Sequence, residues 1–186
     1  MNIEKELMRE RIISAAMKVF SKYGFFKAPV RLIAEEAGVS KGLVFWYFRN
    51  KQNLIIEVAK RSLPLEIIDS CLERNLRSKS MLECIGRSYM NKYRDPIQRS
   101  LLLHTMTLEM LSQEIAMDIR RICEERINTI AKKVFGETST RAKVALRAFF
   151  GGLMCYVIRP PKDIDEQTFL ENLIDIILSS GYTNEK

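Results

Sequence analysis

Hydrophobic residues recur at helical spacing along most of this 186-residue chain, and no stretch alternates apolar and polar residues for long enough to predict a strand. The first helix is predicted over residues 3–23 and stops at Gly24. Beyond residue 64 six further helices are predicted, separated by short breaks. Their ranges are 65–76, 80–93, 96–111, 112–135, 140–158 and 165–180. The pattern therefore predicts an all-α protein.

Residues 28–51 predict two short helices joined by a tight turn, with a further helix starting at Lys51. Pro29 suits a helix start, because its missing N–H has no partner there. Gly38 stops the first short helix where a left-handed residue is needed. Ser40 is placed to cap the second by accepting a backbone hydrogen bond. This order of helix, glycine-containing turn and helix is a helix-turn-helix.

The second helix of this motif carries aromatic and cationic residues on its outer face. At 100° per residue, Val44 and Phe48 point inward together. The opposite face holds Gly42, Phe45, Trp46 and Arg49. Exposed rings beside cations suit a nucleic-acid groove, where rings meet sugars and thymine methyls and cations meet phosphates. The alternative is that another part of the chain covers the rings.

Two lysines strengthen the interpretation of this face as a nucleic-acid surface. Lys41 and Lys51 lie in the first turns of their helices, where the helix dipole disfavours a cation unless a phosphate binds there. We expect Lys41, Tyr47 and Lys51 to bind phosphates and the others to reach base edges. The predicted DNA-binding residues are Arg31, Ser40, Lys41, Gly42, Leu43, Phe45, Trp46, Tyr47 and Lys51.

At these positions the chain resembles the tetracycline-repressor (TetR) family over residues 8–60. The resemblance rests on Ile12 to Phe20, Tyr23-Gly24-Phe25, Ile33 to Gly42, Trp46-Tyr47-Phe48, Lys51 and Leu54. It implies an all-helical homodimer, an N-terminal DNA-binding domain and a C-terminal domain whose ligand triggers release from the operator. Ala28-Pro29-Val30, Leu43 and Phe45 depart from hydroxyl-bearing residues frequent in that family. The resemblance and these departures imply base recognition through apolar contacts and Arg31.

Charge is concentrated in the segment that carries the motif. The chain has a net charge of +7, and residues 1–62 hold 12 Lys and Arg against 6 Asp and Glu. Such an excess is expected of a phosphate-binding surface. We therefore predict a three-helix helix-turn-helix domain over residues 1–50 and a helical ligand-binding and dimerisation domain over 51–186. Pro64 is either a kink within a long helix, and so a candidate hinge, or the break between two helices.

The cysteines and the single histidine give little support for catalysis or a metal site. Cys71, Cys84, Cys123 and Cys155 show no paired spacing, so we interpret them as small buried residues in a reducing cell, with a redox-sensing pair as the alternative. His104 lies in an apolar run and is expected to be a hydrogen-bonded core or pocket residue, or alternatively a catalytic one. We predict no metal, no cofactor and no enzymatic activity.

The chain shows no sign of a membrane-bound or exported protein. No apolar run approaches the ~20 residues of a membrane span. The first residues are too charged for a signal peptide. We expect a cytoplasmic protein without a membrane partner.

The last two helices are predicted to form a two-fold dimer. Apolar residues follow helical spacing in both, and a mid-helix Gly151-Gly152 suits close packing. Such a dimer implies a roughly palindromic double-stranded DNA operator. The predicted interface residues are Ala142, Ala145, Leu146, Phe149, Gly152, Leu153, Leu173 and Ile177.

Residues 80–155 are predicted to line an apolar effector cavity, because this span contains several methionines and methionine side chains adapt to ligand shape. The alternative is an ordinary packed core. Nearby arginines favour a fatty acid or acyl-CoA, with an aromatic or drug-like compound second. The predicted function is a ligand-released repressor. Its rivals are a constitutive or architectural DNA-binding protein of the same fold and a helical enzyme with a basic N-terminus. The predicted ligand-binding residues are Tyr89, Tyr93, Leu103, His104, Met106, Met110, Met117, Phe150 and Met154.

Overall fold

The computed structural model describes residues 2–111 and 113–181, and every regular element within them is an α-helix. The prediction of an all-α fold is confirmed. The helices form two compact units, each with its own core. None of the described helices is both long enough and apolar enough to cross a lipid bilayer.

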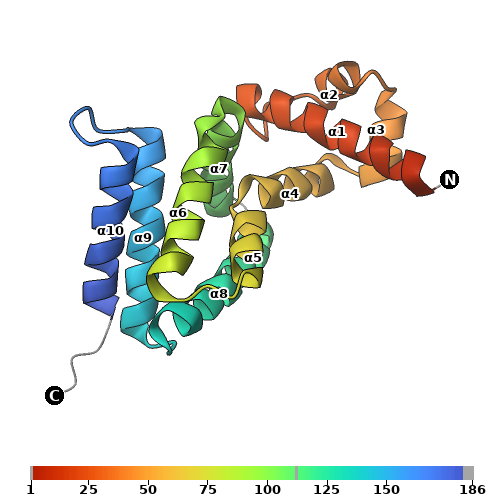
Figure 1. The fold of residues 1–186 in the computed structure, drawn as a ribbon. Coiled ribbons are helices and arrows are strands. Elements are labelled where there is room, and N and C mark those ends of the chain that lie inside the picture. The colour runs from red at the N-terminus through yellow and green to blue at the C-terminus, as the bar shows by residue number, and fades with distance from the viewer. Residues whose placement is uncertain (1, 112, 182–186) are drawn as a thin grey trace. The chain divides into compact units, whose positions relative to one another are not determined.

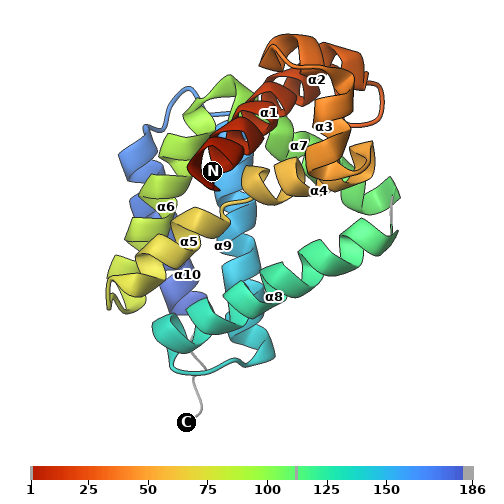
Figure 2. The same ribbon diagram turned by 90° about the vertical axis from the view of Figure 1, so that its right-hand side faces the viewer.

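Unit 1 combines the N-terminal helices with one helix from the middle of the chain. Its core includes Ile12 and Phe20 of the first helix, Ile33 of the second and Leu54 of the fourth, all without exposed surface. Figure 1 and Figure 2 show the second helix beside the long first helix, and the third helix next to the second. The helices of unit 1 are α1 (Asn2–Tyr23), α2 (Val30–Ala37), α3 (Lys41–Phe48), α4 (Lys51–Ser62) and α7 (Pro96–Leu111).

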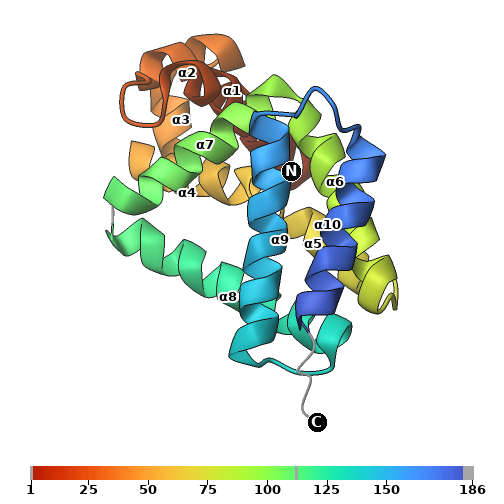
Figure 3. The same cartoon turned by 90° about the vertical axis from the view of Figure 1, so that its left-hand side faces the viewer.

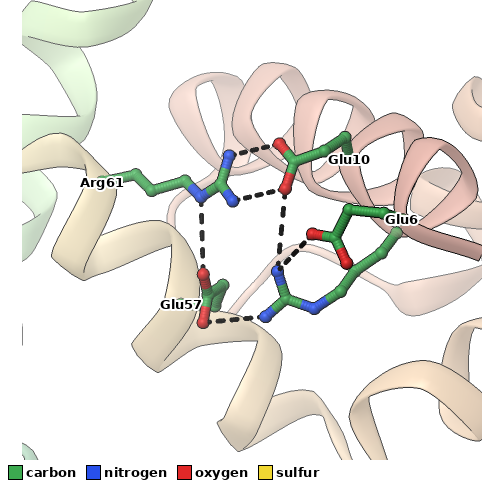
Figure 4. A network of polar contacts seen from close by, with 5 residues as sticks. Glu6, Glu10, Glu57 and Arg61 are labelled. Carbon is green, nitrogen blue, oxygen red and sulfur yellow. Dashed lines mark hydrogen bonds and ion pairs between the residues drawn. The ribbon is translucent and has the colours of Figure 1, made fainter. Parts of the chain in front are cut away.

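An ion-pair network holds α1 to α4 (Figure 4). The Arg61 guanidinium donates to both carboxylate oxygens of Glu10, at 2.5 and 2.6 Å, and to Glu57 at 3.4 Å. Arg9 reaches the same Glu57 at 3.1 Å. The hydrogen bonds and charge of Arg61 lower the pKa of Glu10 below its ordinary value. The helix that begins just after the helix-turn-helix is therefore fixed to α1 by paired charges.

A buried hydrogen bond joins α4 to α7 within the same unit. The hydroxyls of Ser62 and Thr105 are 2.7 Å apart, and both side chains lack exposed surface. Because a buried hydroxyl needs a partner, this pair fixes how the two helices meet.

Unit 2 is built around three helices that pack along their lengths. The antiparallel pair α9 and α10 lies beside α6 (Figure 1, Figure 3). A Cβ on Gly86 of α6 would collide with Leu170, and one on Gly152 of α9 would meet Leu173 at 3.0 Å, so glycine permits the close approach. The helices of unit 2 are α5 (Leu65–Glu73), α6 (Ser78–Arg94), α9 (Thr140–Ile158), α10 (Glu166–Gly181) and α8 (Gln113–Phe135) from residue 120 onward.

Most predicted helix limits agree with the structure, with two differences around α5 and α6. α4 ends at Ser62 and α5 begins at Leu65, so Pro64 marks a break between helices, as one of the two interpretations predicted. The expected helix over 65–76 ends at Glu73. α6 begins at Ser78, where φ is +45°, two residues before the predicted start. Ser112, the predicted first residue of another helix, lies outside the described residues.

The contact pattern groups residues differently from the predicted division at residue 50. α4 and α7 belong to unit 1 with the helix-turn-helix, because their apolar faces pack on α1 and on each other. The functional division into residues 1–50 and 51–186 remains a prediction.

The interpretation of the cysteines as small buried residues is wrong for most of them. Cys71 and Cys84 are bonded to each other, Cys123 is half-buried and Cys155 is exposed. Helical periodicity showed that each lies near an apolar face, but it did not show which side chains meet.

Candidate nucleic-acid interface

Backbone and side-chain caps define the turn between α2 and α3. Gly38 adopts a φ of +64°, and the Val39 N–H then donates to the Ala34 carbonyl at 2.9 Å, which ends α2. The Ser40 hydroxyl accepts from the Leu43 N–H at 3.1 Å and starts α3. Both predicted caps are confirmed, and they produce a helix-turn-helix over these residues.

Two buried side chains fix which face of α3 is presented to solvent. Val44 and Phe48 are 1% and 5% exposed and pack into the unit 1 core, as predicted. The helix stops at Arg49, whose φ is +62°. The Asn50 side chain then accepts from the Asn53 N–H at 2.8 Å and caps α4. Each end of α3 is thus held by local hydrogen bonds.

The outer face of α3 exposes a large aromatic ring. Trp46 is 62% exposed, and its ring meets that of Tyr47 edge-on, with centroids 4.8 Å apart. Gly42 and Arg49 are exposed too, whereas Phe45 and Tyr47 are half-buried. The alternative that the chain covers these rings holds in part for Phe45 and Tyr47 and fails for Trp46. A single exposed indole between cations is unusual for a surface that meets only water.

The predicted phosphate-binding lysines lie in different surroundings. Lys41 is exposed, with its ammonium 5.7 Å from the centre of the Phe45 ring. Lys51 donates to the Phe26 carbonyl at 2.7 Å, and partial burial lowers the pKa of its ammonium. Its position is therefore set by the turn between α1 and α2, while its charge remains near the surface.

Arg31, the predicted base-reading residue, is engaged within its own helix. Its guanidinium contacts the Glu35 carboxylate at 2.5 Å, one turn along α2, and both side chains are mostly exposed. An exposed pair of this kind contributes little to stability. If Arg31 contacts a base, its ion pair with Glu35 is replaced by hydrogen bonds to that base.

Two residues outside the predicted set lie on the same surface. The Lys5 ammonium is 5.0 Å from the centre of the Trp46 ring, and Phe26 is 57% exposed beside the Lys51 contact. The excess of lysine and arginine in residues 1–62 was the only sequence signal for Lys5. Periodicity could not reveal it, because the contact joins two helices far apart in the chain.

The predicted ligand-binding residues are divided between the two units. Tyr89, Tyr93 and Phe150 form an aromatic cluster in unit 2, with the two tyrosine rings 4.5 Å apart. Burial raises the pKa of both phenols. His104 belongs to unit 1, where it packs against Phe25 with ring centroids 6.2 Å apart.

The remaining members of the predicted ligand set are mostly at the surface. Leu103, Met106 and Met117 are exposed, and Met154 is half-buried. The side chain of Met110 lies outside the described part of the structure. Unit 2 has an open hollow of about 440 Å³ lined by residues 75–78 and 132–136, none of which was predicted.

The residues predicted for the dimer interface lie inside the protomer. Most of them are at most 5% exposed, and Gly152 and Leu173 are half-buried against each other. Side chains with no free surface have nothing to offer a partner, so this stripe is the core face of α9 and α10. The opposite face of α9 is the free one, and it carries Val144, Ala148, Gly151 and Cys155.

Comparison with known proteins gives three relevant matches. Residues 12–58 match the model of bacterial regulatory proteins of the tetR family. The HTH-type transcriptional regulator SrpR of Pseudomonas putida is 43% identical over 65 residues, which is 34% of this chain and 30% of that protein. The fatty acid metabolism regulator protein of Bacillus subtilis is 36% identical over 77 residues, 40% of each chain. The chain thus spans less than half the length of these two relatives.

Solved structures extend the likeness beyond the helix-turn-helix. A TetR-like transcriptional regulator from Rhodococcus sp. RHA1 has a TM-score of 0.70 at 17% identity, over 91% of this chain and 93% of that one. FadR from Bacillus subtilis in complex with stearoyl-CoA has a TM-score of 0.69 at 18% identity, over 92% and 98%. At these identities the likeness concerns the fold. The capped helix-turn-helix lies within residues 12–58, where the chain is similar to bacterial regulatory proteins of the tetR family, and the described residues share the fold of the solved TetR-like regulator.

Proposed function

We propose that this protein binds operator DNA as a homodimer through α3 and acts as a repressor that a small lipophilic ligand releases. The observation that carries the DNA-binding part is the outer face of α3. This helix is anchored by Val44 and Phe48 and exposes Trp46 and Arg49. An anchored helix that shows an indole and cations has the size and chemistry to enter a major groove.

In this proposal the residues around α3 divide the recognition between phosphates and bases. Lys41, Tyr47 and Lys51 bind phosphates, and Lys5 adds a further cation beside Trp46. Phosphate contacts set the position of the helix on the duplex without reading the sequence. Base recognition then falls to Arg31 and to apolar contacts from the remaining residues of the predicted set.

The dimer in this proposal uses the free face of α9, a change from the residues expected from sequence. Val144 is 58% exposed and lies in line with Ala148, Gly151 and Cys155 at helical spacing. A Cβ on Gly151 would touch nothing in its own protomer. Such a stripe of small and apolar residues suits close packing of two identical helices around a two-fold axis.

The effector in this proposal is a fatty acid or an acyl-CoA. The support is the relative named as a fatty acid metabolism regulator, together with a similar fold solved with stearoyl-CoA. Within this chain the aromatic cluster of buried Tyr89 and Tyr93 with half-buried Phe150 is the candidate wall of the site. The second candidate function is a constitutive DNA-binding protein, favoured by the exposure of Leu103, Met106 and Met117 among the predicted ligand residues.

Selection from random duplexes followed by fluorescence-anisotropy titration tests the DNA-binding part. We expect a roughly palindromic preferred site, to which Trp46→Ala binds at least about tenfold more weakly, because about 1.4 kcal/mol of aromatic contact is lost. Ile164→Ala, which removes an exposed apolar side chain from unit 2, is the matched control. Equal affinities for the wild type and Trp46→Ala would contradict the assignment of α3 as the reading helix.

Calorimetry with a chain-length series of fatty acids and acyl-CoAs tests the effector. A true effector binds the two states of the dimer unequally, so we expect operator affinity to fall about 5- to 150-fold when it is present. Tight binding of every member without a change in operator affinity, or no binding at all, would favour the constitutive alternative.

A further inference from the structure

Unit 2 contains a pair of cysteines that the proposed function does not use. Cys71 of α5 and Cys84 of α6 form a disulfide, with Cα atoms 6.0 Å apart and a separation of 13 positions in sequence. Cys71 is 1% exposed, whereas Cys84 is half-buried. Cys123 and Cys155 are not bonded to another cysteine. The fold therefore brings together one specific pair out of four thiols.

The helix that carries Cys71 has few fully buried side chains. Among the nine residues of α5 only Ile68 and Cys71 are fully buried. α5 also makes polar, partly exposed contacts with α8. The Arg126 guanidinium donates to Asp69 at 2.9 and 3.1 Å, and Lys133 donates to the Leu72 carbonyl at 2.8 Å. The bond to Cys84 adds a covalent link between α5 and α6, which lies beside it (Figure 2).

The position of α5 in the chain links this attachment to the DNA-binding helices. α4 ends at Ser62 and α5 starts at Leu65, so the two helices are joined by two residues. α4 itself is fixed to α1 through Arg61 and Glu10. A change in the freedom of α5 therefore acts at the point where the chain leaves the helix-turn-helix unit.

We propose that Cys71 and Cys84 form a reversible thiol–disulfide switch, oxidised by a hydroperoxide, that weakens operator binding. This inference rests on the proposed DNA-binding function. A DNA-binding regulator works in a compartment whose thiols are kept reduced, where disulfides are usually transient or redox-sensing. When the bond forms, α5 can no longer follow α4 as the helix-turn-helix adjusts to the duplex, so the DNA-bound state is disfavoured.

The chemistry is a two-electron oxidation in two steps. The Cys84 thiolate, the more accessible of the two, attacks one peroxide oxygen. An S–O bond forms and the O–O bond breaks. The other oxygen takes a proton and leaves as water, or as an alcohol when the oxidant is an organic peroxide. The Cys71 thiolate then attacks the sulfur of this sulfenic acid, forming the S–S bond and releasing a second water. Two thiols and one hydrogen peroxide give one disulfide and two waters. A dithiol reductant reverses the change.

The test uses the full chain in two forms, reduced with dithiothreitol and reoxidised with hydrogen peroxide. Labelling with N-ethylmaleimide and peptide mass mapping should find four reactive cysteines in the unfolded reduced form and two, Cys123 and Cys155, in the oxidised form. The operator selected above should bind the oxidised form at least about fivefold more weakly. The melting temperature of the reduced form should be lower by several degrees, since a short loop is no longer closed.

Matched variants separate the pair from the other thiols. Cys123→Ser/Cys155→Ser should keep the full response to peroxide. Cys84→Ala should lose the response and bind like the reduced wild type; this site is half-buried, so the change is tolerated more easily than one at Cys71. The switch alone would be overturned by any of three results. Dithiothreitol fails to reduce the bond in the folded protein, peroxide fails to re-form it, or both forms bind the operator with equal affinity. A reduced protein that binds no DNA would overturn the proposed function as well.

Discussion

At the residue scale, Lys51, a predicted phosphate contact, combines a fixed position with a charge near the surface. Its ammonium is held 2.7 Å from the Phe26 carbonyl, so little side-chain entropy is lost when a phosphate binds. We expect Lys51→Ala to weaken binding to all duplexes alike and to reduce the slope of log K against log salt by about one. Anisotropy titrations between low and moderate salt measure both quantities.

Lys51→Arg and Lys132→Ala are the controls for this prediction. Arginine keeps the charge, so the salt slope should stay near the wild-type value. Lys132 is exposed on α8 and has no predicted role in DNA binding, so its removal should leave the slope unchanged. A Lys51→Ala protein with an unaltered slope would remove this residue from the phosphate contacts.

Arg31 is predicted to discriminate one base pair, at the expense of its contact with Glu35. If it reads a guanine, Arg31→Ala should cost about 1–3 kcal/mol at the preferred site and relax the preference at that base pair alone. Glu35→Gln releases Arg31 from its 2.5 Å pair and should strengthen binding without changing the preferred sequence. Competition titrations with each single-base variant of the site distinguish the two results. A uniform loss over all sequences would make Arg31 a phosphate contact.

The turn and the inner face of the helix-turn-helix were predictable from sequence because they depend on local geometry. Gly38, Ser40, Val44 and Phe48 set the turn and the inner face through contacts within a few residues, and the structure places all four as expected. Lys5 was missed because its contact with Trp46 joins residues 41 positions apart. Helical spacing within one element carries no information about such a contact.

At the scale of elements, the network between α1 and α4 predicts a specific response to pH. The pKa of Glu10 is lowered in the folded state, so the pair stabilises the fold above the unfolded pKa of about 4.3. That stability is lost as the pH falls through the lower, folded value. Both side chains are partly exposed, so solvent screening limits the contribution to about 1 kcal/mol.

Urea denaturation at pH 7 and near pH 3.5 measures this contribution. Glu10→Gln should lower the free energy of unfolding by about 1 kcal/mol at pH 7 and make a smaller difference at the acidic pH. Glu171→Gln, an exposed carboxylate on α10 that contacts only its helical neighbour Gln167 among the described side-chain hydrogen bonds, should show no such difference. Equal losses for Glu10→Gln at both pH values would show that the side chain acts through packing and not through its charge.

Element limits were predictable wherever a residue has one clear conformational preference. Gly24 ends α1, and Pro64 and Pro96 mark starts close to where they were expected. The start of α6 was misplaced, because Ser80 and Glu83 have the spacing of a capping box while the chain enters the helix through Ser78 at positive φ. A capping pattern states which residues can cap, and the preceding loop decides which position is used.

At the scale of the whole molecule, a strong apolar stripe on a helix does not by itself indicate a dimer interface. The most regular stripe of α9, containing Leu146, Phe149 and Leu153, packs inside the protomer. The free face is weaker in hydrophobicity because it holds small residues such as Ala148 and Gly151. Sequence distance is an equally weak guide for the predicted ligand-binding residues, because His104 and Tyr93 are near in sequence yet belong to different units. Periodicity orders faces by hydrophobicity and does not assign them to a core or to a partner.

The free face of α9 leads to the last prediction, that Gly151→Glu abolishes the dimer and leaves the protomer folded. In the protomer a Cβ at Gly151 meets nothing within 4 Å, so a glutamate there extends into solvent. In a two-fold dimer packed on this face, two such carboxylates would face each other close to the axis. Like charges buried together cost several kcal/mol, so the dimer dissociation constant should rise at least about 100-fold.

Sedimentation velocity at micromolar concentration measures the association, and circular dichroism of the same samples reports the helices. Phe149→Glu is unsuitable for this purpose, because Phe149 has no exposed surface and a buried charge there would unfold the protomer. Thr129→Glu, at an exposed position of α8, adds the same charge away from the stripe and should remain dimeric. Because half-sites on an operator are bound together by a dimer, Gly151→Glu should also lose most of its affinity for the palindrome while keeping the weak binding of a single half-site. A Gly151→Glu protein that still sediments as a dimer would place the interface on another face of unit 2.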